Sequence, residues 1–344
     1  MRERDAIVDD STDRAVATGD AAAGLDAAAA DIVDKLDDRL REARAHQGDW
    51  REQAREDYAF VAGDQWSAED RERLVEQLRP VITFNRVAPI VDSVAGTEVN
   101  NRQEVRYVPR QAGDVGVNEL LTGAAEWVRD QCDAEDEESD AFWDTLVCGM
   151  GWTETRLDYE QDPDGKILIE RVDPLEMYWD PAARKRNLDD ARYVIRVRLI
   201  DEADFEQMWP GRAELLGPDG ATGADDAGGG GIHIVDPATW YEGDGARAPI
   251  DAAGKYRVIE YQWREHETFW RLVDPATRRI AELSDDSYRA LERRLGTHGL
   301  RLDAVRQRRR VVRRAFVCAG TVLEHGPSPV PGAFTYQAIT GKRD

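Results

Sequence analysis

The chain has 344 residues, of which 41% are hydrophobic and 33% charged, so it can form a core beneath a well-solvated surface and is long enough for two domains. Asp and Glu total 69 against 46 Lys and Arg, which gives a net charge of −23. Because phosphate binding requires a cationic surface, this balance argues against a protein that coats nucleic acid. It fits ordinary solubility, and it also fits a surface along which DNA slides without being held.

The cysteine and histidine residues give no sign of a metal framework. Three Cys and five His are scattered along the chain, without the spacing of a zinc site or a disulfide scaffold, which indicates a reducing compartment. No apolar run is long enough for a membrane span, and the first ten residues contain no apolar signal core. We therefore expect a protein made and kept in a cytosol, with no cofactor and no membrane partner.

The first part of the chain is predicted to be helical. Residues 1–25 are rich in Asp, Ala, Gly and Thr and lack a periodic apolar face, which predicts a disordered acidic leader. Residues 26–150 predict a mainly helical, wing-type region. In it, Gly63 is placed to end one helix, Ser67 to cap the next and Asn85 to cap a third.

An acidic run, D-A-E-D-E-E-S-D, occupies residues 133–140 between two helical patterns. Such a run can bind a divalent metal ion, although it more often forms the solvated surface of a helix. With a metal bound, Asp133, Glu135, Asp136 or Glu137 would serve a metal-dependent nuclease or hydrolase.

The remaining segments predict strands and loops. Residues 102–110 alternate between apolar and polar and predict a strand. Several short strands with tight turns in residues 151–210 predict a small antiparallel β-barrel or sandwich. Residues 211–254 are rich in Gly and Asp and predict a flexible loop, since their four consecutive glycines lack the spacing of a phosphate-binding loop. Residues 255–330 predict a mixed strand-helix-strand region of stem or clip type, and residues 331–344 form no finished element. The expected fold class is α+β.

One basic patch stands out near the end of the chain. It can be the polar side of a strand pair, or it can contact DNA or an acidic partner surface. Its six arginines are Arg306, Arg308, Arg309, Arg310, Arg313 and Arg314.

Large aromatic residues exceed what small local cores would need. Such residues suit interfaces between subunits. The candidates for subunit packing are Trp50, Trp66, Trp127 and Trp143.

Three blocks of sequence resemble the portal proteins of short-tailed bacteriophages. The first block is Tyr58–Arg102, which begins Y-A-F-V-A-G-D-Q-W and ends T-E-V-N-N-R. The second is G-M-G-W-T-E-T-R-L-D-Y-E followed by I-E-R-V-D-P-L-E-M-Y-W-D-P, and the third is A-F-V-C-A-G-T-V-L-E-H-G-P-S-P. Together they cover about residues 55–330, in the order and at the distances found in the family.

The resemblance implies a homo-oligomeric ring of twelve subunits at one vertex of a phage head. A separate terminase pumps double-stranded DNA through such a ring, and tail or head-completion proteins attach to it later. The resemblance also implies contacts with capsid and scaffolding proteins and a location in the virion, with the host cytoplasm as the place of assembly. Family members have no catalytic site and continue into further wall, channel and crown elements. This chain, which stops at Asp344, is therefore expected to be truncated relative to the family, as in a split gene or a prophage remnant.

Three hypotheses follow from the sequence: a portal subunit, a metal-dependent nuclease or hydrolase, and a head-completion adaptor protein. The chain shows no nucleophile with a base beside it, and its one acidic run is local rather than assembled from separate elements. These observations favour the structural role.

Overall fold

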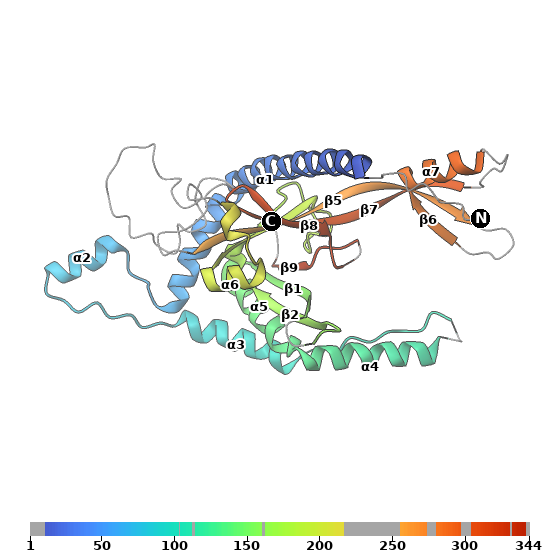
Figure 1. The fold of residues 1–344 in the computed structure, drawn as a ribbon. Coiled ribbons are helices and arrows are strands. Elements are labelled where there is room, and N and C mark those ends of the chain that lie inside the picture. The colour runs from blue at the N-terminus through green and yellow to red at the C-terminus, as the bar shows by residue number, and fades with distance from the viewer. Residues whose placement is uncertain are drawn as a thin grey trace, which may run out of the picture. The chain divides into compact units, whose positions relative to one another are not determined.

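The computed structural model describes residues 11–102, 104–111, 114–159, 162–216, 255–273, 280–296, 304–330 and 332–341. The described residues form an α+β protein, as predicted from the sequence (Figure 1). The helices are α1 (Ser11–Ala62), α2 (Ala68–Glu76), α3 (Val87–Asn100), α4 (Val115–Gln131), α5 (Ala134–Cys148), α6 (Glu202–Met208) and α7 (Asp285–Gly296), with 3-10 turns η1 (Pro174–Glu176) and η2 (Ala213–Leu216). The strands are β1 (Met150–Asp158), β2 (Lys166–Val172), β3 (Met177–Trp179), β4 (Tyr193–Ile200), β5 (Tyr256–Val273), β6 (Ile280–Ser284), β7 (Ala304–Cys318), β8 (Thr321–Pro327) and β9 (Tyr336–Thr340).

The chain divides into two compact units, each built from segments that are far apart in the sequence. The first unit comprises residues 1–47, 195–261 and 315–325. The second comprises residues 48–194, 262–314 and 326–344.

The first unit has an aromatic core beside the amphipathic part of α1. Leu36 and Leu40 of α1 are fully buried, as their helical spacing predicts. In the core, Phe205 stacks on Tyr256 with 4.4 Å between ring centroids. Burial raises the pKa of Tyr261 to about 12, although the guanidinium of Arg39, which donates a hydrogen bond to its hydroxyl, acts in the opposite direction.

The strands form two sheets, and the strand pairs for which the register is known are antiparallel. The smaller sheet has the order β2-β1-β9, with Trp152 of β1 opposite Val172 on one side and Ala338 on the other. The larger has the order β3-β4-β5-β7-β8, with β6 paired to β5. Neither strand order closes into a barrel among the described residues, so the strands of residues 151–210 are shared between two sheets instead of forming a barrel of their own.

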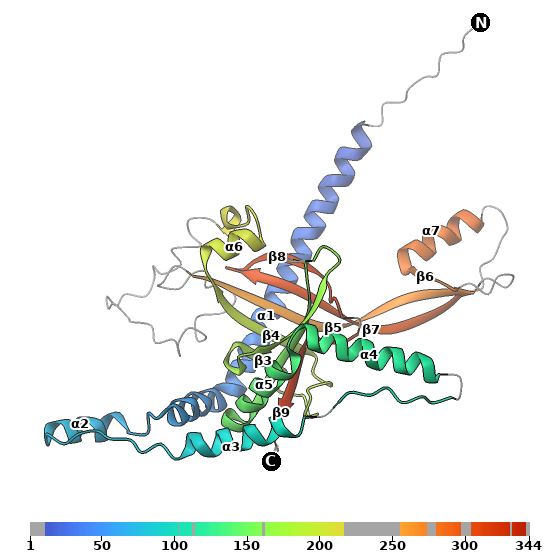
Figure 2. The same cartoon turned by 90° about the horizontal axis from the view of Figure 1, so that it is seen from below.

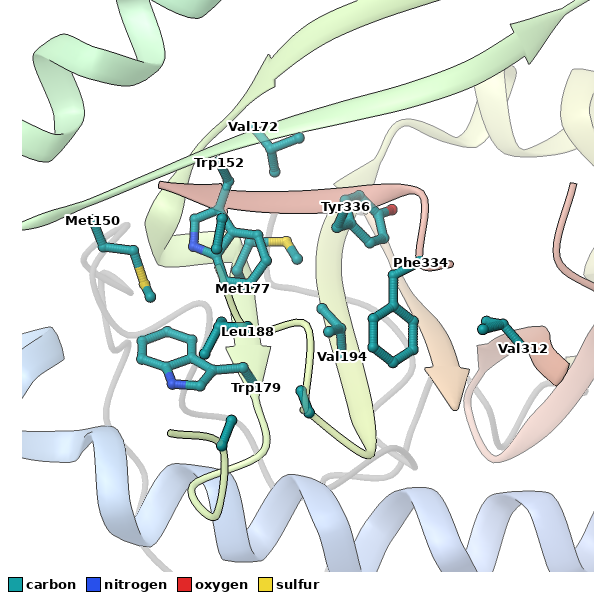
Figure 3. Packing of buried hydrophobic residues seen from close by; sticks show 13 residues of the cluster. Met150, Trp152, Val172, Met177, Trp179, Leu188, Val194, Val312, Phe334 and Tyr336 are labelled. Atoms are coloured by element: carbon teal, nitrogen blue, oxygen red, sulfur yellow. The ribbon is translucent and has the colours of Figure 1, made fainter. Parts of the chain in front are cut away.

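The core of the second unit is rich in tryptophan. Trp152 lies 6.0 Å from Trp179 between ring centroids, and Trp50 of α1 meets Trp179 edge-on at 5.1 Å. Figure 3 shows this cluster, with Met150 near the two rings and Phe334 beyond them. Since the cluster draws on α1, β1, β3 and β9, it ties together four segments that are distant in sequence.

Three segments differ from the sequence-based expectation. Helix α1 begins at Ser11, inside the expected leader, where alanine-rich sequence favours a helix. The described residues of 102–110 form no strand; there, the Tyr107 amide donates to the hydroxyl of Thr122 on α4 at 3.1 Å. Residues 336–340, for which no finished element was expected, form β9, because β2 occupies only one edge of β1 and leaves the other free for pairing. The four-glycine run lies outside the described residues.

Candidate functional site: an arginine-rich strand and exposed apolar helices

The six candidate arginines lie on β7, which pairs with β5. Arg306, Arg308, Arg309 and Arg310 are exposed, while Arg313 and Arg314 are half-buried. Figure 1 shows this end of β7 beside β5, with β6 and α7 next to it. The structure therefore brings the predicted basic patch together on one strand.

Two arginines of the patch are held by acidic side chains. Arg309 forms ion pairs with Glu267 at 3.2 Å and with Glu282 at 2.7 Å, and its guanidinium lies 4.8 Å from the ring centroid of Phe269. Arg313 lies 3.5 Å from Glu265 of β5. These two residues match the interpretation of a strand pair with a polar side.

The other three exposed arginines of β7 differ from Arg309 and Arg313 in their contacts. Arg306, Arg308 and Arg310 form no hydrogen bond or ion pair within the part of the chain that the structure describes. Successive side chains of a strand alternate between its faces, so these three share one face, opposite to that of Arg309. Their guanidinium groups are available for an anionic partner.

Helix α7 covers part of the neighbouring strand. Trp270 of β5 stacks on Tyr288 of α7 with 3.9 Å between ring centroids, and its indole donates to Asp285 at 2.7 Å. This hydrogen bond, with the nearby charges of Arg289 and Arg306, lowers the pKa of Asp285. The carboxylate is therefore ionised near neutral pH and contributes negative charge beside Arg306.

The four candidate tryptophans have different environments. Trp50 is half-buried against the core of the second unit and donates to the Cys148 carbonyl at 3.0 Å. Trp143 lies 6.0 Å from Tyr58 between ring centroids. Trp66 donates to the Ile82 carbonyl at 3.3 Å but is partly exposed, and Trp127 of α4 is exposed. Of the four, Trp127 is the most available for a contact between subunits.

Sequence reasoning missed how much of the apolar surface of α3 and α4 faces solvent. Neither helix has a fully buried residue. Helix α4 lies in the region predicted to be helical, and its Leu120 and Trp127 lie in solvent. Helical periodicity reveals such a face but does not reveal what covers it.

The acidic run of residues 133–140 begins α5 and pairs with arginines. Arg102 contacts Glu135 at 3.0 Å and Asp136 at 2.6 Å, and Arg129 forms a bidentate pair with Glu138. Within the described residues, no group of three His, Cys, Asp or Glu side chains is placed to hold a metal ion. Three carboxylates of the run are thus paired with arginines from neighbouring segments.

Comparison with known protein families decides between the hypotheses. Residues 37–344 match the phage P22-like portal proteins. The chain belongs to this family. No curated protein matches the chain. Membership implies a portal or connector role as a component of a virion, within a ring oligomer that meets other phage assembly proteins.

Family membership excludes the hypothesis of an enzyme. P22-like portal proteins are structural and non-enzymatic, so the hypothesis of a metal-dependent nuclease or hydrolase is wrong. The match is to a portal family, which also favours a portal subunit over a head-completion adaptor. Among the described helices, none combines the length and the apolar character needed to cross a membrane.

Proposed function

We propose that this chain is a subunit of a dodecameric portal ring through which phage DNA is packaged and ejected and to which the tail is attached. The observation that carries the proposal is the family match over residues 37–344. The partners are a terminase, capsid and scaffolding proteins, tail or head-completion proteins, and the double-stranded DNA in the channel. The protein acts in the virion and assembles in the host cytoplasm.

The charge of the chain supports a conduit for DNA. A net charge of −23 disfavours tight, non-specific binding to a phosphate backbone. Tight binding would slow translocation, so an acidic subunit suits a channel through which DNA must move.

The arginines of β7 that form no ion pair among the described residues are the proposed contact with DNA or with an acidic partner surface. Arg308 and Arg310 are exposed and share a strand face, whereas Arg309 is held by two glutamates. Removing one phosphate contact reduces the slope of log affinity against log salt concentration by about one unit. Replacing both Arg308 and Arg310 with Ala should therefore weaken DNA binding and flatten its salt dependence in fluorescence anisotropy, while Arg309→Ala should change DNA binding little. Equal effects of the two changes would contradict the proposed contact.

Assembly of heads tests the proposed function directly. The tagged chain would be co-expressed with its phage's capsid and scaffolding proteins, and the heads would be imaged by electron microscopy with a label on the tag. A portal subunit gives label at a single vertex of each head. Heads that carry no label, or that carry the label at all of their vertices, would contradict the proposal.

A further inference from the structure

An arm of the second unit presents apolar side chains to solvent. The arm is defined as residues 77–86, which follow α2 and have no regular secondary structure. Leu78 is 94% exposed and Phe84 81%, and Ile82 is also exposed. Three large apolar side chains that are all exposed on one short segment indicate a binding surface.

The C-terminal half of the arm is held by hydrogen bonds. Trp66 donates from its indole to the Ile82 carbonyl at 3.3 Å, and Asn85 donates from its amide to the Val61 carbonyl at 2.7 Å. The Asn85 side-chain oxygen also accepts the amides of Val87 and Ala88, which ties the arm to the start of α3. A segment held in this way loses little conformational freedom when it binds.

A second apolar surface lies on α4. It is called the α4 stripe and consists of Val117, Leu120 and Trp127, whose spacing places them on one side of the helix. All three are exposed, Leu120 at 73% and Trp127 at 64%. Both views place α2, which leads into the arm, and α4 at opposite ends of the row α2, α3 and α4 (Figures 1 and 2).

The charges beside the two surfaces are complementary. The arm carries exposed Arg79 and Arg86, and the α4 stripe is flanked by exposed Asp114 and Asp130. Across the described part of the chain, none of these four side chains forms a hydrogen bond or an ion pair. Opposite charges at the edges of two apolar patches give orientation as well as attraction.

The two surfaces are compatible in length when the arm is extended. From Asp114 to Asp130 the helix spans ~24 Å, at ~1.5 Å per residue. From Arg79 to Arg86 an extended chain spans at most ~25 Å, at up to ~3.6 Å per residue. One arm can therefore lie along one stripe with a basic residue near each acidic one.

We infer that the arm of one copy docks on the α4 stripe of a second copy, as a head-to-tail contact between neighbouring subunits. A closed ring requires such a contact between two different surfaces of the same chain, and in both views the arm and α4 lie on opposite sides of α3. The inference rests on the proposed ring and identifies the surfaces that join its subunits.

Complementation between two variants tests the inference. The arm variant combines Leu78→Ser with Phe84→Ser, and the stripe variant combines Leu120→Ser with Trp127→Ser. All four side chains are exposed, so both variants should fold. The matched control replaces two exposed apolar residues elsewhere in the second unit, Ile280→Ser with Val305→Ser. Sedimentation velocity and mass photometry would give the oligomeric state.

The expected result has two parts. Each variant alone should show at least a 10-fold lower fraction of rings, while the wild-type chain and the control assemble. An equimolar mixture of the arm and stripe variants should give one-to-one dimers, because each copy retains one intact half of the contact.

Three outcomes would overturn the inference. If both variants form normal rings, the two surfaces serve another occupant and the proposed ring stands. If the mixture stays monomeric, the two surfaces do not bind each other. If the wild-type chain itself is monomeric, the proposed ring fails together with the inference.

Discussion

Asp144 of α5 lies at the centre of a buried polar network that joins three elements of the second unit. Its side chain has no exposed surface and accepts two hydrogen bonds from Arg171 of β2, at 2.5 and 2.8 Å. The hydroxyl of Tyr58, on α1, donates to the same carboxylate at 2.7 Å. The network thereby fixes α1 and β2 against α5.

The first prediction concerns this network. Asp144→Asn should lower the free energy of unfolding by ~3 kcal/mol, because it leaves the guanidinium of Arg171 without its charged partner in a partly buried site. Urea denaturation followed by circular dichroism would measure the change. In the matched control, Glu69→Gln removes an exposed i,i+4 pair with Arg73, and its effect should stay below ~0.5 kcal/mol. Equal losses for the two variants would argue against the network.

The second prediction concerns Asp180, which closes the turn after β3. Although burial acts in the opposite direction, hydrogen bonds from the side chain and amide of Arg192 and from the amide of Ala182 hold the pKa of Asp180 below its ordinary value of 3.8. A carboxyl group whose pKa falls on folding stabilises the folded state above its ordinary pKa. That stability is lost as the pH falls through the lower, folded-state pKa.

Asp180→Asn should therefore be clearly less stable than the wild-type chain near pH 6, and the difference should shrink as the pH falls below 3.8. Thermal or urea unfolding at several pH values would measure it. If the difference in stability between the two proteins stayed constant down to the lowest pH measured, the charge of Asp180 would contribute nothing to stability.

At the scale of elements, β1 lies close against α5. At Gly151, a Cβ atom would lie 1.9 Å from the backbone oxygen of Ala141 on α5, and backbone cannot withdraw as a flexible side chain can. In contrast, a Cβ atom at Gly123 on α4 would meet nothing within 4 Å. The same substitution should therefore have opposite effects at the two sites.

The third prediction is that Gly151→Ala lowers the melting temperature strongly, because β1 must move away from α5 at a cost of ~3 kcal/mol or more. Gly123→Ala should raise it slightly, since Ala is favoured over Gly inside a helix by ~0.5–1 kcal/mol. Differential scanning calorimetry of the two variants would check both signs. A neutral Gly151→Ala would mean that β1 and α5 are not in close contact.

Local signals in the sequence predicted the local structure well. Ser67 caps α2, with its hydroxyl accepting the Asp70 amide at 3.0 Å, and the Asn85 side chain accepts amides at the start of α3, as expected. The helix expected within the strand-helix-strand region of residues 255–330 is α7. Caps and helix spacing depend on neighbouring residues, so one segment contains the whole signal.

Pairing between distant segments could not be predicted in the same way. β9 (Tyr336–Thr340) pairs with β1 (Met150–Asp158), which is far away in the sequence, and neither segment contains a signal that identifies its partner. Residues 102–110 alternate as a strand would, but a strand also needs a partner strand for its backbone hydrogen bonds, and this segment pairs with no strand among the described residues. For the same reason, the sequence could not show which β7 arginines form ion pairs. The glutamates that pair with Arg309 and Arg313 lie on β5 and β6.

The whole molecule combines well-buried cores with apolar side chains that stay exposed. Each compact unit buries its own core, whereas α3, α4 and the arm keep apolar side chains in solvent. A monomeric protein rarely exposes so much apolar surface at defined positions. Because the chain belongs to the P22-like portal family, we expect neighbouring subunits to bury this surface.

Assembly of this chain into a portal ring can be measured by electron microscopy of the purified protein, combined with its native mass. We expect closed rings with a central channel and a mass near twelve times the 38.7 kDa of one subunit. A protein that stays monomeric and ring-free at the concentrations at which phage proteins assemble would contradict it.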